Sequence, residues 1–161
     1  MNNRTKNIVY AAIVAALYVV LTEFAAMLGL ASQPIQLRFS EALNALCLFT
    51  PYAIPGMFIG CLIANLVTGA VVWDVIFGSI ATLIGATGVY LLRKNKILAL
   101  VCPVVSNAVI IPFVLTYAYG LTDGIWYFVL TVGIGQIISC TVLGYFLGEA
   151  VDKRKKWLFR Q

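Results

Sequence analysis

The sequence contains no histidine and few charged residues, and both absences narrow what the protein can do. Only 11% of its 161 residues are charged, whereas a soluble domain normally carries about 25%. Without histidine, no Ser/His/Asp catalytic set can form, and because the cysteines form no CxxC pair either, the usual zinc-ligand spacing is absent. The phosphate-binding pattern G-x-x-x-x-G-K-[ST] is also absent, so the chain does not hydrolyse ATP by that route. We therefore predict no enzymatic activity, no metal and no cofactor.

Apolar residues, by contrast, make up 62% of the sequence. A soluble fold of this length would leave many of them in water, while a membrane-spanning helix needs about 20 of them in a row. We predict an all-α polytopic membrane protein, with one transmembrane domain over residues 1–161. The net charge of +5 does not predict a nucleic-acid partner, because the basic residues lie at segment ends. Four cysteines without CxxC pairing are interpreted as packing residues: Cys47, Cys61, Cys102 and Cys140.

Hydropathy divides the chain into six apolar segments. The first is interpreted as an uncleaved helix, because Glu23 interrupts it and it exceeds an ordinary signal core. The second ends at Pro51 and is too short to span upright, so it either crosses partly among other helices or re-enters. Alternating apolar residues before it predict an extended piece over residues 35–39. The predicted segments are residues 7–28, 40–50, 54–72, 74–92, 97–119 and 125–149, and a basic soluble tail follows at 152–161.

The distribution of basic residues predicts the orientation. With six crossings and the N-terminus inside, ten of the eleven lysines and arginines fall inside, and only Arg38 falls outside. A five-crossing arrangement splits the positive loops between the two sides. We therefore predict six transmembrane helices in the lipid bilayer of the cell membrane, with both termini cytoplasmic. The same topology places four acidic residues on or near the outer side: Glu23, Glu41, Asp74 and Asp123.

Small residues recur at helical spacing in three of the segments. Pairs of small residues four apart let two helices approach closely. Gly56, Gly60 and Ala64 lie on the third segment, and a similar run starts at Cys140 on the sixth. Internal packing and partner docking both remain open for these sets. The first segment carries two such pairs: Ala11 with Ala15, and Ala12 with Ala16.

Ionisable and amide side chains within the segments are candidates for binding, because burying them in a membrane costs a few kcal/mol. Arg38 and Glu41 are three residues apart, so a helix would place them on one face as a salt bridge. Asp74 opens the fourth segment, where it also suits helix capping. Asn107 and Gln136 lie near the centres of two segments and are also suited to pair as interhelical contacts.

Asn65 and a group of aromatic residues complete the candidate set. Asn65 lies four residues before Gly69 on the third segment. Aromatic residues cluster at the predicted outer face, where most belong to an interfacial belt and one or two would stack on a flat ligand. Together these groups suit a planar molecule rich in hydrogen-bond donors. The aromatic cluster consists of Trp73, Tyr117, Tyr119, Trp126 and Tyr127.

Three ordered blocks carry a family resemblance. Residues 36–43 (QLRFSEAL) fit the pattern Q-x-R-x-S-E-x-L. Residues 53–65 (AIPGMFIGCLIAN) and 74–82 (DVIFGSIAT) follow, fitting A-I-P-G-x-x-x-G-C-x-x-A-N and D-x-x-x-G-S-x-A-T. In order and spacing these blocks resemble the QueT family. The resemblance covers essentially the whole chain and is strongest over residues 35–82.

The resemblance implies a bacterial S component, the substrate-binding subunit of an energy-coupling factor (ECF) transporter. Such a subunit is expected to have six helices and an outward-facing pocket. It docks through an A-x-x-x-A face on a transmembrane coupling subunit, which two cytoplasmic ATPases drive. The implied ligands are queuosine precursors, the 7-deazaguanines preQ0 and preQ1. The residues that match the docking face are Ala11, Ala12, Ala15 and Ala16.

With such a ligand, each candidate residue acquires an expected role. Glu41 accepts the adjacent N–H donors of the guanine-like edge, and Arg38 holds Glu41. Asp74 pairs with the cationic aminomethyl arm of preQ1. Amides read the carbonyl and the ring nitrogens, and an aromatic covers the ring face. The remaining expected contacts are Asn65, Asn107, Gln136, Tyr117 and Trp126.

Three other functions remain open from the sequence. The chain is also compatible with an S component for another vitamin, because such pocket chemistry is generic. A solitary secondary transporter or channel would use a proton-coupled carboxylate such as Glu23 or Glu41. A membrane-embedded assembly factor would use only its small-residue faces. A requirement for ATP and partner subunits separates the importer from the solitary transporter, and small-molecule binding separates it from the assembly factor.

Overall fold

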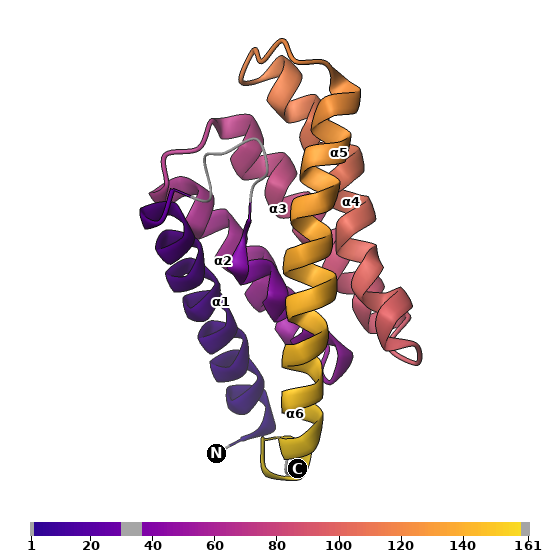
Figure 1. Cartoon of the computed structure of the whole chain (residues 1–161). Helices are drawn as coiled ribbons and strands as arrows, with labels where there is room; N and C mark the ends of the chain where they lie inside the picture. The colour runs from indigo at the N-terminus through magenta and orange to yellow at the C-terminus, as the bar shows by residue number, and fades with distance from the viewer. Residues whose placement is uncertain (1, 30–36, 159–161) are drawn as a thin grey trace.

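The computed structural model describes residues 2–29 and 37–158, with side chains up to Arg154, and all regular secondary structure in this part of the chain is helical. This confirms the all-α prediction for the described residues (Figure 1). The second and seventh elements are irregular, a 3₁₀-helix and a π-helix. In chain order the elements are α1 (Asn3–Met27), η1 (Phe39–Leu48), α2 (Ala53–Val67), α3 (Val72–Leu91), α4 (Lys96–Tyr117), α5 (Ile125–Gln136), η2 (Ile137–Leu143) and α6 (Gly144–Leu158).

Among the described residues, four helical stretches are long and apolar enough to cross a membrane. Three of them are α1, α3 and α4. The fourth is the continuous 30-residue stretch Ile125–Arg154, which α5, η2 and α6 form together. The prediction of helices that are long and apolar enough to cross a membrane is confirmed for these four. The two shorter apolar helices are η1, with 10 residues, and α2, with 15 residues. Helix length alone does not decide whether these two also cross, so the count of six stays a prediction.

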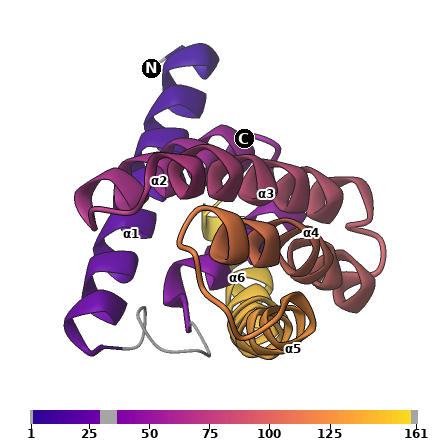
Figure 2. The same cartoon turned by 90° about the horizontal axis from the view of Figure 1, so that it is seen from above.

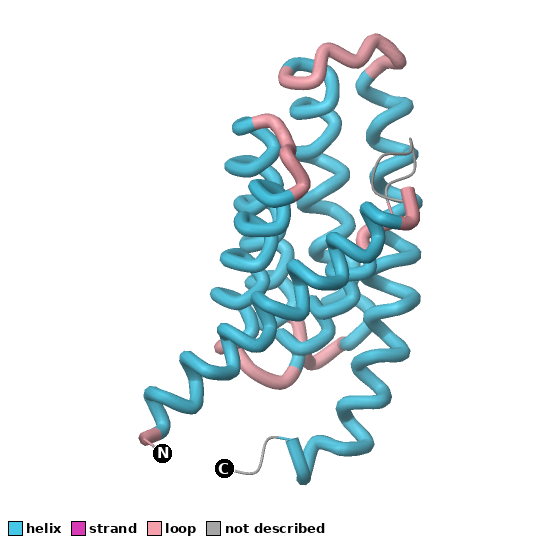
Figure 3. The backbone as a smooth tube through the Cα atoms, turned by 90° about the vertical axis from the view of Figure 1, so that its left-hand side faces the viewer, coloured by secondary structure: helices cyan, strands magenta, loops and turns pink. Residues whose placement is uncertain are grey.

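The helices pack around η1, which contacts α1, α2, α3, α4, η2 and α6. Neighbours in sequence are also neighbours in space from α1 to α4, and α4 contacts α5. Figure 2, which looks along α5 and α6, shows α1 on one side of the bundle and α4 on the other. The start of α1 and the end of α6 lie at the same end of the bundle (Figures 1 and 3). The opposite end therefore holds the end of α1 and the α2–α3 and α4–α5 connections.

The 3₁₀ geometry of η1 suits a short segment that must reach far into the bundle. A 3₁₀-helix rises about 2.0 Å per residue against about 1.5 Å in an α-helix, so ten residues extend about 20 Å instead of about 15 Å. Most of η1 is buried, including the polar residues Ser40, Glu41 and Asn44. Pro51, close behind it, lacks a backbone N–H and cannot continue the helix. The predicted boundary at Pro51 therefore agrees with the structure.

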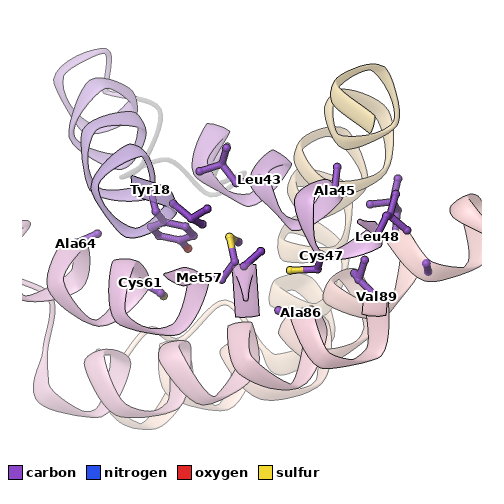
Figure 4. Close-up of a cluster of buried hydrophobic side chains, with 14 residues drawn as sticks. Tyr18, Leu43, Ala45, Cys47, Leu48, Met57, Cys61, Ala64, Ala86 and Val89 are labelled. Atoms are coloured by element: carbon purple, nitrogen blue, oxygen red, sulfur yellow. The ribbon is translucent and has the colours of Figure 1, made fainter. Parts of the chain in front are cut away.

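The main hydrophobic core forms between η1 and the helices around it. Figure 4 shows side chains of α1, η1, α2 and α3 gathered in this cluster, among them Tyr18, Met57 and Val89. All four cysteines are free thiols, and Cys47, Cys61 and Cys140 are buried. The prediction that they act as packing residues is confirmed for Cys47 and Cys61, which belong to this cluster, whereas Cys140 makes hydrogen bonds to buried polar groups.

Helices α1 and α2 approach so closely that two positions on α2 have room only for glycine. A Cβ on Gly56 would lie 2.6 Å from the carbonyl oxygen of Ala11. A Cβ on Gly60 would lie 2.7 Å from the Cβ of Tyr18 and 3.0 Å from the Cα of Ala15. Real Cβ atoms do not come this near to backbone or Cβ atoms. The small residues of the third predicted segment therefore serve internal helix packing.

Two predicted boundaries differ from the structure. Helix α6 runs to Leu158, so most of the predicted soluble tail is a helical extension of the last segment. The extension has no glycine or proline to end it after Gly148, and Lys96 anchors its start through Glu149 at 2.7 Å and Asp152 at 2.9 Å. The extended piece over residues 35–39 is shorter than predicted: Arg38 is extended but Phe39 starts η1, and residues 35 and 36 lie outside the described part.

The α1–α2 contact predicts a large effect from a small substitution. Gly56→Ala should destabilise the protein by about 1–3 kcal/mol, because its methyl group overlaps the backbone of α1. The measurement is thermal unfolding of the detergent-purified protein. Gly133→Ala is the matched control, since nothing lies within 4 Å of a Cβ at that helical position. Equal unfolding temperatures for the two variants would contradict the close approach.

Candidate ligand-binding site

A polar cavity of about 380 Å³ lies at the end of the bundle opposite the chain termini. Its volume falls within the range of small-molecule pockets, about 300–1,000 Å³. The walls come from the end of α1, from Arg38, from the connection between α2 and α3, and from the end of α4 and the residues after it. The lining residues are Thr22, Ala26, Arg38, Asn65, Thr68, Gly69, Ala70, Asp74, Leu115, Tyr119 and Leu121.

Asp74 is the acidic group of this cavity, and one of its oxygens is free. It lies in the first turn of α3, where the helix dipole favours a carboxylate. Its Oδ2 accepts a hydrogen bond from the Tyr119 hydroxyl at 2.9 Å and lies 3.9 Å from Nη2 of Arg38. Its Oδ1 is buried and has no hydrogen-bond partner. A buried acceptor without a donor is unfavourable, so Oδ1 is a point at which a ligand donor would bind well.

Asn65 and Tyr119 hold Asp74 in place. Asn65 Nδ2, on α2, donates to the backbone oxygen of Asp74 at 3.3 Å and so ties α2 to the start of α3. Tyr119 follows α4, and burial together with the nearby Asp74 carboxylate raises the pKa of its phenol. The hydroxyl is therefore protonated at neutral pH and remains a donor to Asp74.

Glu41 occupies a different environment, fully buried at the centre of the bundle. Its Oε1 accepts from the hydroxyl groups of Tyr18 and, at 3.4 Å, Thr82. Its Oε2 accepts from Asn44 Nδ2 at 2.8 Å and from the Cys140 thiol at 3.8 Å. These donors come from α1, α3, η1 and η2, so one carboxylate links four elements. Glu41 does not line the polar cavity.

The predicted salt bridge between Arg38 and Glu41 is wrong. Arg38 precedes η1 and is extended, with φ −103° and ψ 95°, so the two residues do not share a helix face. The ion pair that the described residues show for Arg38 is the one to Asp74, with 3.9 Å between Nη2 and Oδ2. Arg38 therefore belongs to the wall of the cavity and does not hold Glu41.

Comparison with known proteins identifies the family of the chain. A family model described as QueT transporter matches residues 8–153. The chain belongs to the QueT transporter family. Over 95 residues it is 43% identical to the queuosine precursor transporter QueT of Lactococcus lactis subsp. cremoris (strain MG1363), an alignment that covers 58% of this chain and 56% of that protein. The chain thus aligns with just over half the length of this relative. No solved structure matches it.

Family membership and the four long apolar helices together describe a multi-pass membrane protein of a transporter family. The first and third motif blocks each contribute one residue to the polar cavity and another to the cluster of hydrogen bonds around Glu41. The first block supplies Arg38 to the cavity and Glu41 to the buried cluster, and the third supplies Asp74 to the cavity and Thr82 to the cluster. The second block supplies Asn65 to the cavity and also Gly56 and Gly60 to the α1–α2 contact.

Four other predicted ligand contacts lie away from the cavity in this QueT-family chain. Asn107 is buried and donates to the Pro103 oxygen of its own helix at 2.9 Å. Gln136 is buried and accepts from the Cys140 thiol at 2.9 Å, so the predicted pairing of the two amides does not form. Tyr117 and Trp126 are 76% and 82% exposed on the outside of the bundle.

Sequence reasoning missed several residues that the structure brings into these sites. Thr22 lines the cavity and donates to Ser40 Oγ at 2.8 Å, and Tyr18 donates to Glu41 one turn earlier on α1. Both look like ordinary packing residues of an apolar helix, so the sequence gives no signal for them. Thr82 could have been found, because it is a fixed position of the third motif block.

The predicted docking face lies in a broad apolar groove of about 1,010 Å³ along α1 and α2. Ala12 and Ala16 are exposed in it, whereas Ala15 is buried against Gly60 and the backbone of Ala11 faces Gly56. The two alanine pairs therefore differ. Ala11 and Ala15 serve mainly the contact between α1 and α2, whereas Ala12 and Ala16 point outward. The groove is lined by Arg4, Asn7, Ile8, Ala11, Ala12, Ala15, Ala16, Val19, Val20, Tyr52, Pro55, Ile59 and Ile63.

The Glu41 cluster predicts a loss of stability from a nearly isosteric change. Glu41→Gln replaces one acceptor oxygen by an NH₂ group that must face a donor, either Asn44 or Tyr18. Leaving a buried polar group unsatisfied costs about 1–3 kcal/mol, so the unfolding temperature in detergent should fall clearly. Glu149→Gln is the control, because that carboxylate is partly exposed and pairs with Lys96 near the surface. A Glu41→Gln protein as stable as the control would show that the cluster does not stabilise the fold.

Proposed function

We propose that this chain is the substrate-binding S component of an ECF importer and captures 7-deazaguanine queuosine precursors at the outer face of the membrane. The observation that carries the proposal is the polar cavity at the end opposite the termini, with a buried carboxylate oxygen free to accept. Membership of the QueT transporter family and the name of the Lactococcus lactis relative, a queuosine precursor transporter, support the same substrate class.

The cavity chemistry suits such a ligand. A 7-deazaguanine is flat and presents N–H donors beside a carbonyl acceptor. Asp74 Oδ1 accepts an N–H, and the amide of Asn65 and the guanidinium of Arg38 offer donors for the carbonyl. Glu41 is not a direct contact in this arrangement, because it does not line the cavity and each of its oxygens already has a donor, Tyr18 for Oε1 and Asn44 for Oε2.

The charge distribution along the bundle supports six crossings with both termini in the cytoplasm. Lys96 and the basic end of α6 lie at the end where the chain starts, and Arg38 lies at the cavity end. Such a separation is what the positive-inside rule favours. In this topology η1 and α2 complete the crossings, and the cavity opens to the outside.

ATP hydrolysis in the proposed cycle belongs to partner subunits. The chain carries no phosphate-binding loop motif. The apolar groove on α1 and α2 is the proposed contact for the transmembrane coupling subunit, which two cytoplasmic ATPases drive. Exposed Ala12 and Ala16 let a partner helix approach closely, as small residues do in membrane helix pairs.

Ligand binding by the purified protein tests the substrate proposal. We expect calorimetry to show binding of preQ1 or preQ0, and the Tyr119→Phe variant to bind about fivefold more weakly. The reason is that this hydroxyl holds Asp74 in position, and one hydrogen bond contributes about 1 kcal/mol.

The matched control for this experiment is Tyr117→Phe. It removes the same hydroxyl two residues earlier, from a side chain that is 76% exposed and does not line the cavity. Its affinity should equal that of the unaltered protein. If Tyr117→Phe weakened binding and Tyr119→Phe did not, the ligand would lie on the outside of the bundle, and the cavity assignment would be wrong.

Partner capture tests the importer proposal separately. The double variant Ala12→Leu, Ala16→Leu fills the groove and should retain far less coupling subunit and ATPases in co-purification, with ligand affinity unchanged. Ile13→Trp is the control: it also enlarges a side chain on the same helix, but outside the groove. Ligand uptake by vesicles that contain this chain alone would instead favour a solitary transporter.

A further inference from the structure

Glu23 is a carboxylate in the apolar helix α1 that belongs to neither polar site described above. It lies one turn before the end of α1 and does not line the cavity. Its side chain is partly buried, and its Oε1 is buried without a hydrogen-bond partner among the described residues. Ionisable side chains in membrane segments normally pair with one another or face the bundle interior or a cavity. The described part of the chain therefore leaves this oxygen to a donor from another molecule.

The direction of Glu23 follows from helical geometry. At 3.6 residues per turn, or about 100° per residue, positions 12, 16, 19 and 23 fall within about 60° of one another around α1. Ala12, Ala16 and Val19 line the apolar groove along α1 and α2. Tyr18, which belongs to the core, lies about 140° away from Glu23 around the helix. Glu23 therefore stands on the groove side of α1, one turn beyond Val19.

The charges around the groove define what a partner helix must carry. The lining is mainly apolar, and its one charged residue, Arg4, lies at the start of α1. Glu23 lies beyond the opposite end of the groove, about 10 Å along α1 from Ala16. A helix that packs along this surface must therefore be apolar where it meets the alanines and positive where it meets Glu23.

A second copy of this chain does not meet that requirement. Two copies in one membrane have the same orientation, so a two-fold contact through the groove would pack α1 against α1 in parallel. The two Glu23 carboxylates would then approach each other at the same depth. Like charges that face each other across an interface are unfavourable. The groove therefore suits a different membrane protein, one with a basic side chain at this depth.

We propose that Glu23 forms an ion pair with a lysine or arginine of the transmembrane helix that docks in the groove. This inference rests on the proposed function, since the docking protein is the coupling subunit of the importer. The partner helix approaches closely at Ala12 and Ala16, and the ion pair fixes its register about 10 Å farther along α1. A helix without a basic group there would leave the carboxylate buried and unpaired, which is strongly unfavourable. Glu23 thus determines which helix can dock.

Binding of the coupling module to Glu23 variants tests the ion pair. The module, which is the coupling subunit with its two ATPases, is purified and titrated against the fluorescently labelled chain in detergent. Glu23→Gln keeps the size of the side chain and removes its charge. We expect this variant to raise the dissociation constant by at least about tenfold, because it breaks a buried charge pair. Glu23→Leu should raise it by at least as much.

The controls separate docking from folding. Asp123→Asn removes a carboxylate from an exposed position in the α4–α5 connection, away from the groove, and should leave the dissociation constant unchanged. Because Glu23 Oε1 has no partner in the described chain, Glu23→Leu should not lower the unfolding temperature of the chain alone. Its affinity for preQ1 or preQ0 should also equal that of the unaltered protein, since Glu23 does not line the cavity.

The sign of the effect decides the inference. If no basic group faces Glu23 in the complex, docking buries an unpaired carboxylate, and Glu23→Leu would bind the module as tightly as the unaltered chain or more tightly. That result, or unchanged binding by Glu23→Gln, would overturn the ion pair alone, provided that Ala12→Leu, Ala16→Leu loses binding. If the unaltered chain does not bind the module, or if the double variant binds as well as the unaltered chain, docking through the groove itself fails.

Discussion

The fold depends on how the negative charge of Glu41 is accommodated at the centre of the bundle. A carboxylate with no exposure to solvent is costly unless its oxygens are hydrogen-bonded. Here the donors are Tyr18, Asn44, Thr82 and Cys140, from four different elements. Because each donor must reach the same two oxygens, the carboxylate fixes the relative positions of α1, η1, α3 and η2. The burial of η1 among its neighbours is possible because this charge is satisfied.

The two irregular helices meet at this carboxylate. Glu41 lies on the 3₁₀-helix η1, and Cys140 lies on the π-helix η2, which packs against η1. A 3₁₀ run of ten residues is unusual, as is a π-helix of seven. Both helices depart from α-helical geometry in the stretch where buried polar side chains must point toward their hydrogen-bond partners. Two buried atoms near this contact, Asn44 Oδ1 and Ser139 Oγ, still have no partner, so the polar centre is not fully satisfied.

Helix α1 connects the two surfaces that the proposed importer needs. Its inward face carries Tyr18 and Thr22, which bond to Glu41 and Ser40, and Thr22 also lines the cavity. Its outward face carries Ala12 and Ala16 in the apolar groove. The same rigid helix thus carries part of the proposed ligand site and part of the proposed docking site. A partner that tilts α1 would act on both through the Glu41 cluster.

Much of the architecture could be predicted from the sequence, because hydropathy and the position of Pro51 depend on local composition. The motif residues Arg38, Asn65 and Asp74 were likewise found as candidates, and the structure brings them to one cavity. What could not be predicted is which carboxylate is free. Glu41 takes a donor from Tyr18, 23 residues away, and others from Thr82 and Cys140, 41 and 99 residues away. The sequence alone determined a helical membrane protein of the QueT family with two acidic motif positions. Only the tertiary structure decided that Glu41 has a donor on both oxygens while one oxygen of Asp74 has none, because hydrogen bonding depends on donors that folding brings from distant positions.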